Sequence, residues 1–229
     1  GNPDEGIAIG DVDGDGVDEI VAGDSWYKFV SPDRGWRSYR FGSSYPFPRL
    51  QVADLDGDGR MEIIASEGDA HIFGKPEGGR AGWYAAGDDP TEPWEEHVLE
   101  ELLLDAHTLQ VGDFTGDGRP DILVGEIGIP DNPRKPRCVL YRNTGGPGVG
   151  VATGDGGFAT SDGAGPPAAG GAGGDAPRLE RHVVEEGLSH HEGRVADIYG
   201  TGRLDIVAKP LVGAERWDIF VYKNLGGAR

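Results

Sequence analysis

The residues best suited to chemistry are four acids that share one short segment. Asp11, Asp13 and Asp15 occupy its first, third and fifth positions, and Glu19 occupies the ninth. Alternation turns these carboxylates to one side of a curled loop, and Gly16 at position six permits the positive φ angle that the curl requires. A hard cation that accepts about six to eight oxygen ligands relieves their mutual repulsion, and Ca²⁺ is the usual one. The segment therefore predicts a calcium loop.

The same acidic loop returns three times along the chain. The second loop has Asp54, Asp56, Asp58 and Glu62, the third has Asp113, Thr115, Asp117 and Asp121, and the fourth has Asp197, Tyr199, Thr201 and Asp205. The backbone carbonyl at position seven, from Val17, Arg60 or Arg119, completes the first three ligand sets. We expect about three Ca²⁺ sites, because the Thr115 hydroxyl can still coordinate. The fourth loop keeps acids only at positions one and nine and should stay empty.

The residues that follow each loop predict strands. An EF-hand would have a Glu at position twelve and would continue as a helix. Here position twelve is Ala22, Ala65, Val124 or Ala208, each in a short run that contains β-branched residues. Because β-branched side chains favour strands, the helical calcium loops are excluded.

Four copies of strand, acidic loop and strand resemble the FG-GAP (VCBS-type) repeat of integrin-like β-propellers. The loops and their flanking strands carry the resemblance, and with the strands between them it covers nearly the whole chain. It implies an all-β propeller of four-stranded antiparallel blades with calcium in the loops. The four blades would be a complete ring or part of a larger one, since propellers have about four to eight blades. The repeat occurs in adhesion receptors, lectin-like modules and carbohydrate-active enzymes, so it leaves the function open.

The chain is expected to form a single domain over residues 1–229. The blades are placed at about 5–42, 48–100, 107–186 and 191–225, and the last lacks an outer strand. The third section is expected through 71–73 and 83–84 in the second blade and over 217–222 in the fourth. Residues 144–177 are nearly all Gly, Ala, Pro, Asp and Ser, which predicts a mobile insertion between two strands of the third blade.

Charge narrows the choice of partners. The 229 residues include 40 acids and 21 bases, for a net charge of −19, which argues against nucleic acid or an anionic membrane as a partner. No apolar run suggests membrane insertion, and no signal peptide is evident. The single cysteine, Cys138, lies in an apolar run and is expected to be buried. Since calcium loops of this kind need the high calcium concentration found outside cells, we expect a processed, secreted protein.

A second set of polar residues is predicted at the other end of the blades. Six strand residues span about 20 Å, which separates this end from the calcium positions. The residues six before each loop are Glu5, Pro48, His107 and His191, and those thirteen after each loop start are Asp24, Glu67, Glu126 and Pro210. On propeller blades both sets would lie at the mouth of the channel.

His107, His191, Asp24, Glu67 and Glu126 are therefore the candidate ligand-binding residues. Two histidines that face three carboxylates suit a second metal site or a general acid–base pair. The alternative is that these residues are polar only because a rim is hydrated.

Two functions remain open. The primary hypothesis is a binding module that recognises a glycan or a protein surface through the face opposite the calcium loops. The rival is a carbohydrate-active enzyme. His107 and His191 before the loops, with Glu126 and Lys209 after them, are similar to FG-GAP propellers of aldos-2-ulose dehydratases and polysaccharide lyases. That resemblance implies a metal that polarises a sugar carbonyl while a base removes the neighbouring proton.

Overall fold

The computed structural model describes residues 5–43, 45–129, 132–145, 151–153, 176–211 and 213–226. Within these ranges the strands form four sheets, and the helices are two short 3-10 turns, η1 (Ala70–Phe73) and η2 (Ala214–Trp217). The predicted all-β fold is confirmed. Neither of these helices has the length and apolar character needed to cross a membrane.

The strands pair with their sequence neighbours in antiparallel order. The first sheet contains β1 (Ile7–Gly10), β2 (Glu19–Ala22), β3 (Ser25–Ser31) and β4 (Gly35–Arg40). The second contains β5 (Pro48–Ala53), β6 (Glu62–Glu67), β7 (Gly79–Ala85) and β8 (Glu95–Leu103). The third contains β9 (Thr108–Gly112), β10 (Asp121–Gly125), β11 (Arg137–Asn143) and β13 (Leu179–Glu186), with β12 (Val151–Thr153) parallel to β13 at its edge. The fourth contains β14 (Glu192–Ala196), β15 (Asp205–Lys209) and β16 (Phe220–Tyr222).

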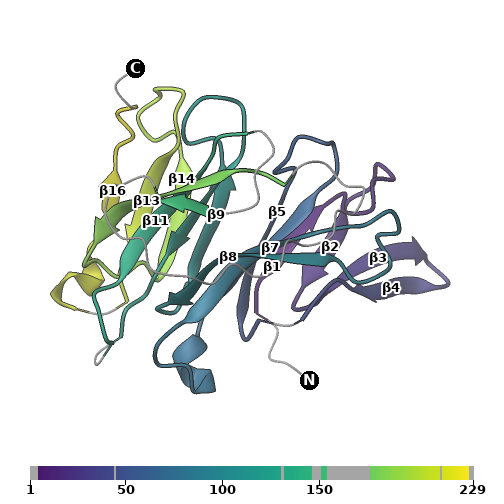
Figure 1. Cartoon of the computed structure of the whole chain (residues 1–229), viewed down its shortest axis with the longest axis horizontal. Coiled ribbons are helices and arrows are strands. Elements are labelled where there is room, and N and C mark those ends of the chain that lie inside the picture. Colours follow the sequence, from purple (N-terminus) through teal and green to yellow (C-terminus); the bar gives the residue numbers. More distant parts are fainter. Residues whose placement is uncertain are drawn as a thin grey trace.

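The four sheets lie side by side in a fan (Figure 1). The first strand of each sheet contacts the first strand of the next, so that β1 meets β5, β5 meets β9 and β9 meets β14. We call these four the inner strands. The first and fourth sheets lie at opposite ends of the fan in Figure 1.

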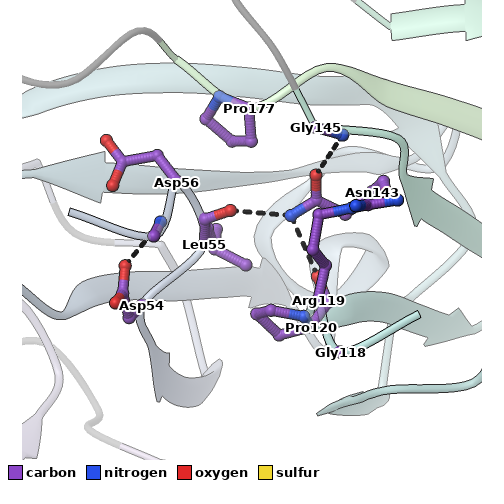
Figure 2. A pocket seen from close by; sticks show the side chains of 10 residues that line it. Asp54, Leu55, Asp56, Gly118, Arg119, Pro120, Asn143, Gly145 and Pro177 are labelled. Carbon is purple, nitrogen blue, oxygen red and sulfur yellow. Dashed lines mark hydrogen bonds between the residues drawn. The ribbon is translucent and has the colours of Figure 1, made fainter. Parts of the chain in front are cut away.

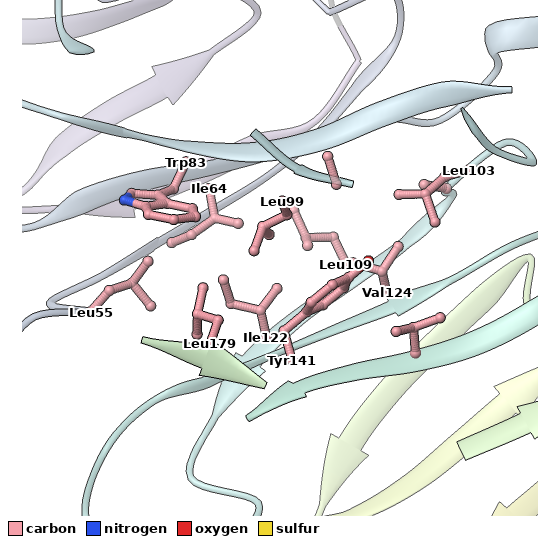
Figure 3. Close-up of a cluster of buried hydrophobic side chains, with 13 residues drawn as sticks. Leu55, Ile64, Trp83, Leu99, Leu103, Leu109, Ile122, Val124, Tyr141 and Leu179 are labelled. Carbon is pink, nitrogen blue, oxygen red and sulfur yellow. The ribbon is translucent and has the colours of Figure 1, made fainter. Parts of the chain in front are cut away.

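A hydrophobic cluster fills each of the three spaces between consecutive sheets. Between the first and second sheets it includes Trp26 and Tyr84. Figure 3 shows the cluster between the second and third sheets, where Trp83 and Ile64 face Tyr141. All three clusters are built from short strands that carry apolar residues on both faces. This pattern is expected for sheets that are buried on two sides.

The third cluster contains the buried cysteine. Cys138 packs with Phe114, Leu123 and Ile206 between the third and fourth sheets. Burial raises the pKa of its thiol to about 12. A thiol with so high a pKa is a poor nucleophile at neutral pH, so Cys138 is a core residue.

One cross-strand pair recurs in every sheet. An Ile that begins the run after the acidic loop lies opposite a Tyr on the third strand. The four pairs are Ile20–Tyr27, Ile63–Tyr84, Ile122–Tyr141 and Ile206–Tyr222. The same cross-strand pair therefore occupies the equivalent position in each of the four sheets.

Two predicted strands differ from the structure. Residues 71–73 lie in η1, because the carboxylate of Asp105 accepts the backbone N–H of His71 at 3.0 Å and Gly74 ends the turn with a φ of 77°. Within 217–222 only Phe220–Tyr222 is a strand, since η2 precedes it.

The predicted insertion at 144–177 lies mostly outside the described residues. Its ends meet where the N–H of Thr144 donates to the carbonyl of Arg178 at 2.9 Å.

Candidate metal loops and inner groove

The four acidic loops have the same backbone framework. The carboxylate at position one accepts the N–H of the glycine at position six, at 2.9 Å between Gly16 and Asp11 and at 2.7 Å between Gly202 and Asp197. Gly16 has a φ of 87°, the left-handed value that the sequence pattern required. This framework holds each loop closed around its acidic side chains.

The acid at position nine is buried in every loop. Glu19, Glu62, Asp121 and Asp205 are each at most 4% exposed, and each accepts the N–H of position two of its own loop. Burial, with the other loop carboxylates nearby, raises the pKa of Glu19 to about 7 and that of Glu62 to about 8. Burial likewise raises the pKa of Asp121 to about 6. A divalent cation would favour the charged form of these groups.

The first two loops bring three carboxylates together. The side-chain oxygens of Asp11, Asp13 and Asp15 lie within 4.8 Å of one another, and those of Asp54, Asp56 and Asp58 do the same. In the first loop the ammonium group of Lys28 reaches from β3 to Asp13, and it lies 2.5 Å from Asp15. A protein cation therefore already lies among the first set of predicted ligands.

Two predicted ligand atoms are buried without a hydrogen-bond partner. They are Oδ1 of Asp13 in the first loop and Oγ1 of Thr115 in the third. A buried polar oxygen left without a partner is costly, and coordination to a cation would remove that cost. The residues of the first and third loops thus fit the predicted ion. The fourth loop has no acid at positions three and five, and its Tyr199 is 51% exposed with the Lys223 ammonium 4.7 Å from its ring.

An asparagine connects neighbouring sheets beside the loops. Asn143, fully buried at the end of β11, donates from Nδ2 to the carbonyl of Leu55 in the second loop at 2.7 Å (Figure 2). Asn224 makes the equivalent bond to Phe114 of the third loop at 2.8 Å. Sequence reasoning missed both residues, although the repeated pattern Tyr-basic-Asn-x-Gly at Tyr141 and Tyr222 could have found them. A cavity of about 160 Å³ lies between the second and third loops at this point.

A larger cavity of about 550 Å³ lies along the four inner strands, at their ends away from the acidic loops. We call it the inner groove. Its polar lining includes Glu5, Arg49, Gln51, His107, Gln110 and Arg194. Leu50 and Leu109 also line it, but each is only 3% exposed because its side chain packs between sheets. Gln51 and Gln110 each lie three residues before an acidic loop, and they are the only glutamines in the chain.

The two predicted histidines are in contact beside the inner groove, and His107 lines it. The rings of His107 and His191 stack with centroids 4.4 Å apart. Nδ1 of His107 lies 2.8 Å from the carbonyl oxygen of His191, which fixes that nitrogen as a donor and leaves Nε2 as an acceptor for Arg49. Glu192 is close enough to offer a third ligand atom with these histidines.

Arg49 connects His107 to Glu5, which the sequence placed at the same end of the blades, and to Asp69, which the sequence did not indicate. Its guanidinium donates to Glu5 at 2.5 Å and lies 3.9 Å from Asp69. Burial and the adjacent Arg49 charge hold the pKa of His107 below its ordinary value. Both ring nitrogens are occupied, so this neutral imidazole could accept a proton or a hydrogen bond from a ligand hydroxyl only after Arg49 moved away from Nε2.

The three predicted carboxylates have other partners. Asp24 forms an ion pair with Arg40 at 2.9 Å, and Glu67 accepts from Lys75 at 2.8 Å. Glu126, fully buried, accepts from Arg134 and from the backbone N–H of Leu104. The structure therefore brings together His107 and His191 but directs the side chains of Asp24, Glu67 and Glu126 into separate ion pairs.

No protein-family model matches this sequence, and no curated protein is significantly similar to it.

Proposed function

We propose that this chain is a secreted, calcium-stabilised binding module of the FG-GAP propeller type, which recognises a carbohydrate in the inner groove. The observation that carries the proposal is the groove itself, a concave cavity of about 550 Å³ lined by the inner strands. Its volume lies within the range of about 300–1,000 Å³ that is usual for small-molecule sites. A protein partner would usually need a broader surface, of about 800 Å² on each side.

The chemistry of the groove suits a sugar. Arg49 and the two glutamines supply hydrogen-bond donors, while Glu5 and Glu192 supply acceptors. Arg49 is paired with Glu5, and Arg194 lies 3.4 Å from Glu192, so the groove offers directional polar groups with little net charge. A neutral, hydroxyl-rich ligand fits this lining.

Calcium supports the proposal indirectly. The loops lie at the ends of the inner strands away from the groove, so an ion there would stabilise the strands without contacting the ligand. The unpaired oxygens of Asp13 and Thr115 are the structural support for the ion, and the residues at positions one to nine supply oxygen ligands of the kind that Ca²⁺ prefers. Occupancy of such loops in turn supports a location outside cells, where calcium is abundant.

A glycan array with the whole chain tests the proposal, followed by titration calorimetry on the sugars that bind. Gln51→Ala and Gln110→Ala should each weaken binding by about five- to tenfold, since a lost hydrogen bond costs about 1–1.5 kcal/mol. Arg194→Ala should also weaken it, whereas Arg34→Ala, an exposed arginine in the turn between β3 and β4, should not. Binding that is unaffected by the groove variants would refute this site.

A second candidate, a carbohydrate-active lyase or dehydratase, is favoured by one observation. The pKa of His107 is lowered by burial and the Arg49 charge, and its Nδ1 is held by the His191 carbonyl, so its Nε2 would serve as a general base or a metal ligand once Arg49 is displaced from it. Incubation of array-positive sugars with the protein, with and without added Zn²⁺ or Mn²⁺, distinguishes the two. Formation of an unsaturated product that is lost in His107→Ala would support the enzyme, and unchanged sugar would support the binder.

A further inference from the structure

We propose that the outer faces of the first and fourth sheets are the two halves of one interface, and that they join this chain to a second copy of itself in a closed ring of eight sheets. The proposal is independent of the ligand in the inner groove. It rests on which side chains each sheet presents to its neighbours, compared at equivalent positions of the four repeats.

The first observation concerns the residues two and four positions before each acidic loop. In the second sheet these are Val52 and Leu50, which pack against the first sheet. In the third sheet they are Val111 and Leu109, which pack against the second sheet. In the first sheet the equivalent residues are Ile9 and Ile7, and they are 65% and 66% exposed. The first sheet thus presents the apolar residues that would receive a preceding sheet.

The repeated Ile–Tyr pair belongs to the same face. Ile63–Tyr84 and Ile122–Tyr141 are buried against the sheet that precedes them in the chain. The corresponding pair of the first sheet, Ile20–Tyr27, is only partly buried. Ile20 and Tyr27 belong neither to the ligand sets of the acidic loops nor to the lining of the inner groove. They therefore lie as an apolar pair on a face that no other described sheet covers.

The fourth sheet presents the complementary face. At position two of the acidic loops, Val12, Leu55 and Phe114 are at most 5% exposed because the next sheet covers them. The equivalent residue of the fourth loop, Ile198, is 51% exposed.

The second and third strands repeat this contrast. The cross-strand pairs Ile64–Trp83 and Leu123–Leu140 pack against the next sheet. The fourth sheet has Val207–Val221 at this register, and Val221 is 41% exposed.

These two faces continue an interface that the chain already makes three times. The exposed face of the first sheet would therefore be covered by the exposed face of a fourth sheet. The exposed face of the fourth sheet would in turn be covered by a first sheet. Because the two faces lie at opposite ends of the fan (Figure 1), a second copy can satisfy both at once. A twofold axis then creates two identical interfaces. Two copies supply eight sheets, which lies within the range of about four to eight known for propellers.

Sedimentation velocity of the purified 229-residue chain in calcium-containing buffer tests the proposal. The wild-type chain should be a dimer whose dissociation constant falls as salt is added, because two chains of charge −19 repel each other until they are screened. Ile9→Asp and Ile198→Asp should each give monomers with unchanged circular dichroism and calcium content. The matched control is Ile72→Asp, which alters a 61% exposed isoleucine of η1 and should leave the dimer intact.

A mixing experiment tests the pairing of unlike faces. An equimolar mixture of the Ile9→Asp and Ile198→Asp chains retains one unaltered interface in the heterodimer, so it should dimerise more tightly than either variant alone. Loss of dimer in only one variant would mean that like faces pair, which overturns the proposal. A wild-type chain that stays monomeric up to about 0.1 mM, where an interface with a micromolar constant would be saturated, overturns it too. So do open polymers in place of dimers.

Discussion

The side-chain amide of Asn143 donates a 2.7 Å hydrogen bond to the backbone carbonyl of Leu55, which lies 88 positions earlier in the chain. The bond joins the end of β11 in the third sheet to the second acidic loop. Asn143 is also held within its own sheet, because its backbone N–H donates a hydrogen bond to the carboxylate of Asp121 at 2.7 Å. One residue therefore connects two acidic loops.

We expect Asn143→Ala to lower the free energy of unfolding by about 1–3 kcal/mol, because the buried Leu55 carbonyl loses its partner. Urea unfolding followed by fluorescence measures the change. Asn132→Ala is the control, since the Nδ2 atom of Asn132 is buried without a hydrogen-bond partner and its removal should cost little. Equal effects of the two substitutions would contradict the role assigned to Asn143.

Calcium removal should destabilise the protein. An ion that binds only the folded state stabilises it by mass action, so excess chelator should lower the melting temperature, most at low ionic strength. Asp56→Ala should lose one equivalent of Ca²⁺ in calorimetric titration. Tyr199→Ala, in the loop predicted to be empty, should lose none. A melting curve that chelation leaves unchanged would rule out a structural role for calcium.

Lys28 should compete with calcium at the first loop. Its ammonium group pairs with Asp13 and Asp15, so a bound ion must displace it. Lys28→Met should raise the calcium affinity of the first loop and lower the melting temperature of the chelated protein, where the carboxylates lose their only cation. The second loop, distant from Lys28, provides an internal control in the same titration. A lower affinity at the first loop would show that Lys28 does not oppose the ion.

Glu126 should contribute to stability, whereas Glu5 should contribute to sugar binding. Glu126→Ala leaves the buried N–H groups of Leu104 and Arg137 without an acceptor and should cost about 3–5 kcal/mol of stability. Glu5, with a side chain that is 47% exposed, should tolerate substitution by Ala with little loss of stability. Sugar binding should weaken in Glu5→Ala only. Chemical denaturation and calorimetry on the same variants provide both measurements.

In calcium-containing buffer, where a bound ion would keep Glu19, Glu62 and Asp121 charged in spite of their raised pKa values, stability should fall on acidification because of His190. This fully buried histidine has Nε2 3.3 Å from Glu185, while its Nδ1 has no partner. Burial lowers its pKa below the ordinary value of about 6.5, although Glu185 opposes the shift. The unfolded state therefore binds a proton more readily, and the stability that is present above about pH 6.5 should be lost as the pH falls through the lower folded-state pKa.

His190→Gln should flatten this pH dependence between about pH 7 and pH 5, the interval in which histidines titrate. His182→Gln, which alters a partly exposed histidine on β13, should leave it unchanged. Melting temperatures recorded across this interval for the three proteins make the comparison. A wild-type slope that persists in His190→Gln would assign the effect to other groups.

Local patterns predicted much of the fold. The alternating acids and glycines of Asp11 to Glu19 anticipated the turn geometry, because a left-handed glycine and an acid at position one suffice to define it. The β-branched run after each loop anticipated β2, β6, β10 and β15 for similar local reasons. The strand expected at 71–73 was wrong because a distant residue, Asp105, stabilises η1.

The candidate site depended on contacts that spacing does not encode. Counting back six residues identified His107 and His191, which the inner strands do bring together. Counting thirteen residues forward from each loop start gave Glu67, but Lys75 lies eight residues away in the chain and pairs with its carboxylate. Arg49, Asp69 and the two glutamines escaped notice because their proximity to His107 or to the inner groove arises only when separate segments of the chain assemble.

The order of the sheets along the row also determines the order in which they unfold. The principal contacts between inner strands join sequence neighbours, so the described sheets of one chain form a row in which stability is approximately a sum of nearest-neighbour terms. In a monomer, such as the Ile9→Asp chain, unfolding of this row should begin at its ends, where a sheet has one neighbour, and reach the middle last. Amide hydrogens of β6 and β10 should therefore exchange with deuterium more slowly than those of β2 and β15, as a gradient of protection centred on the Asn143–Leu55 contact.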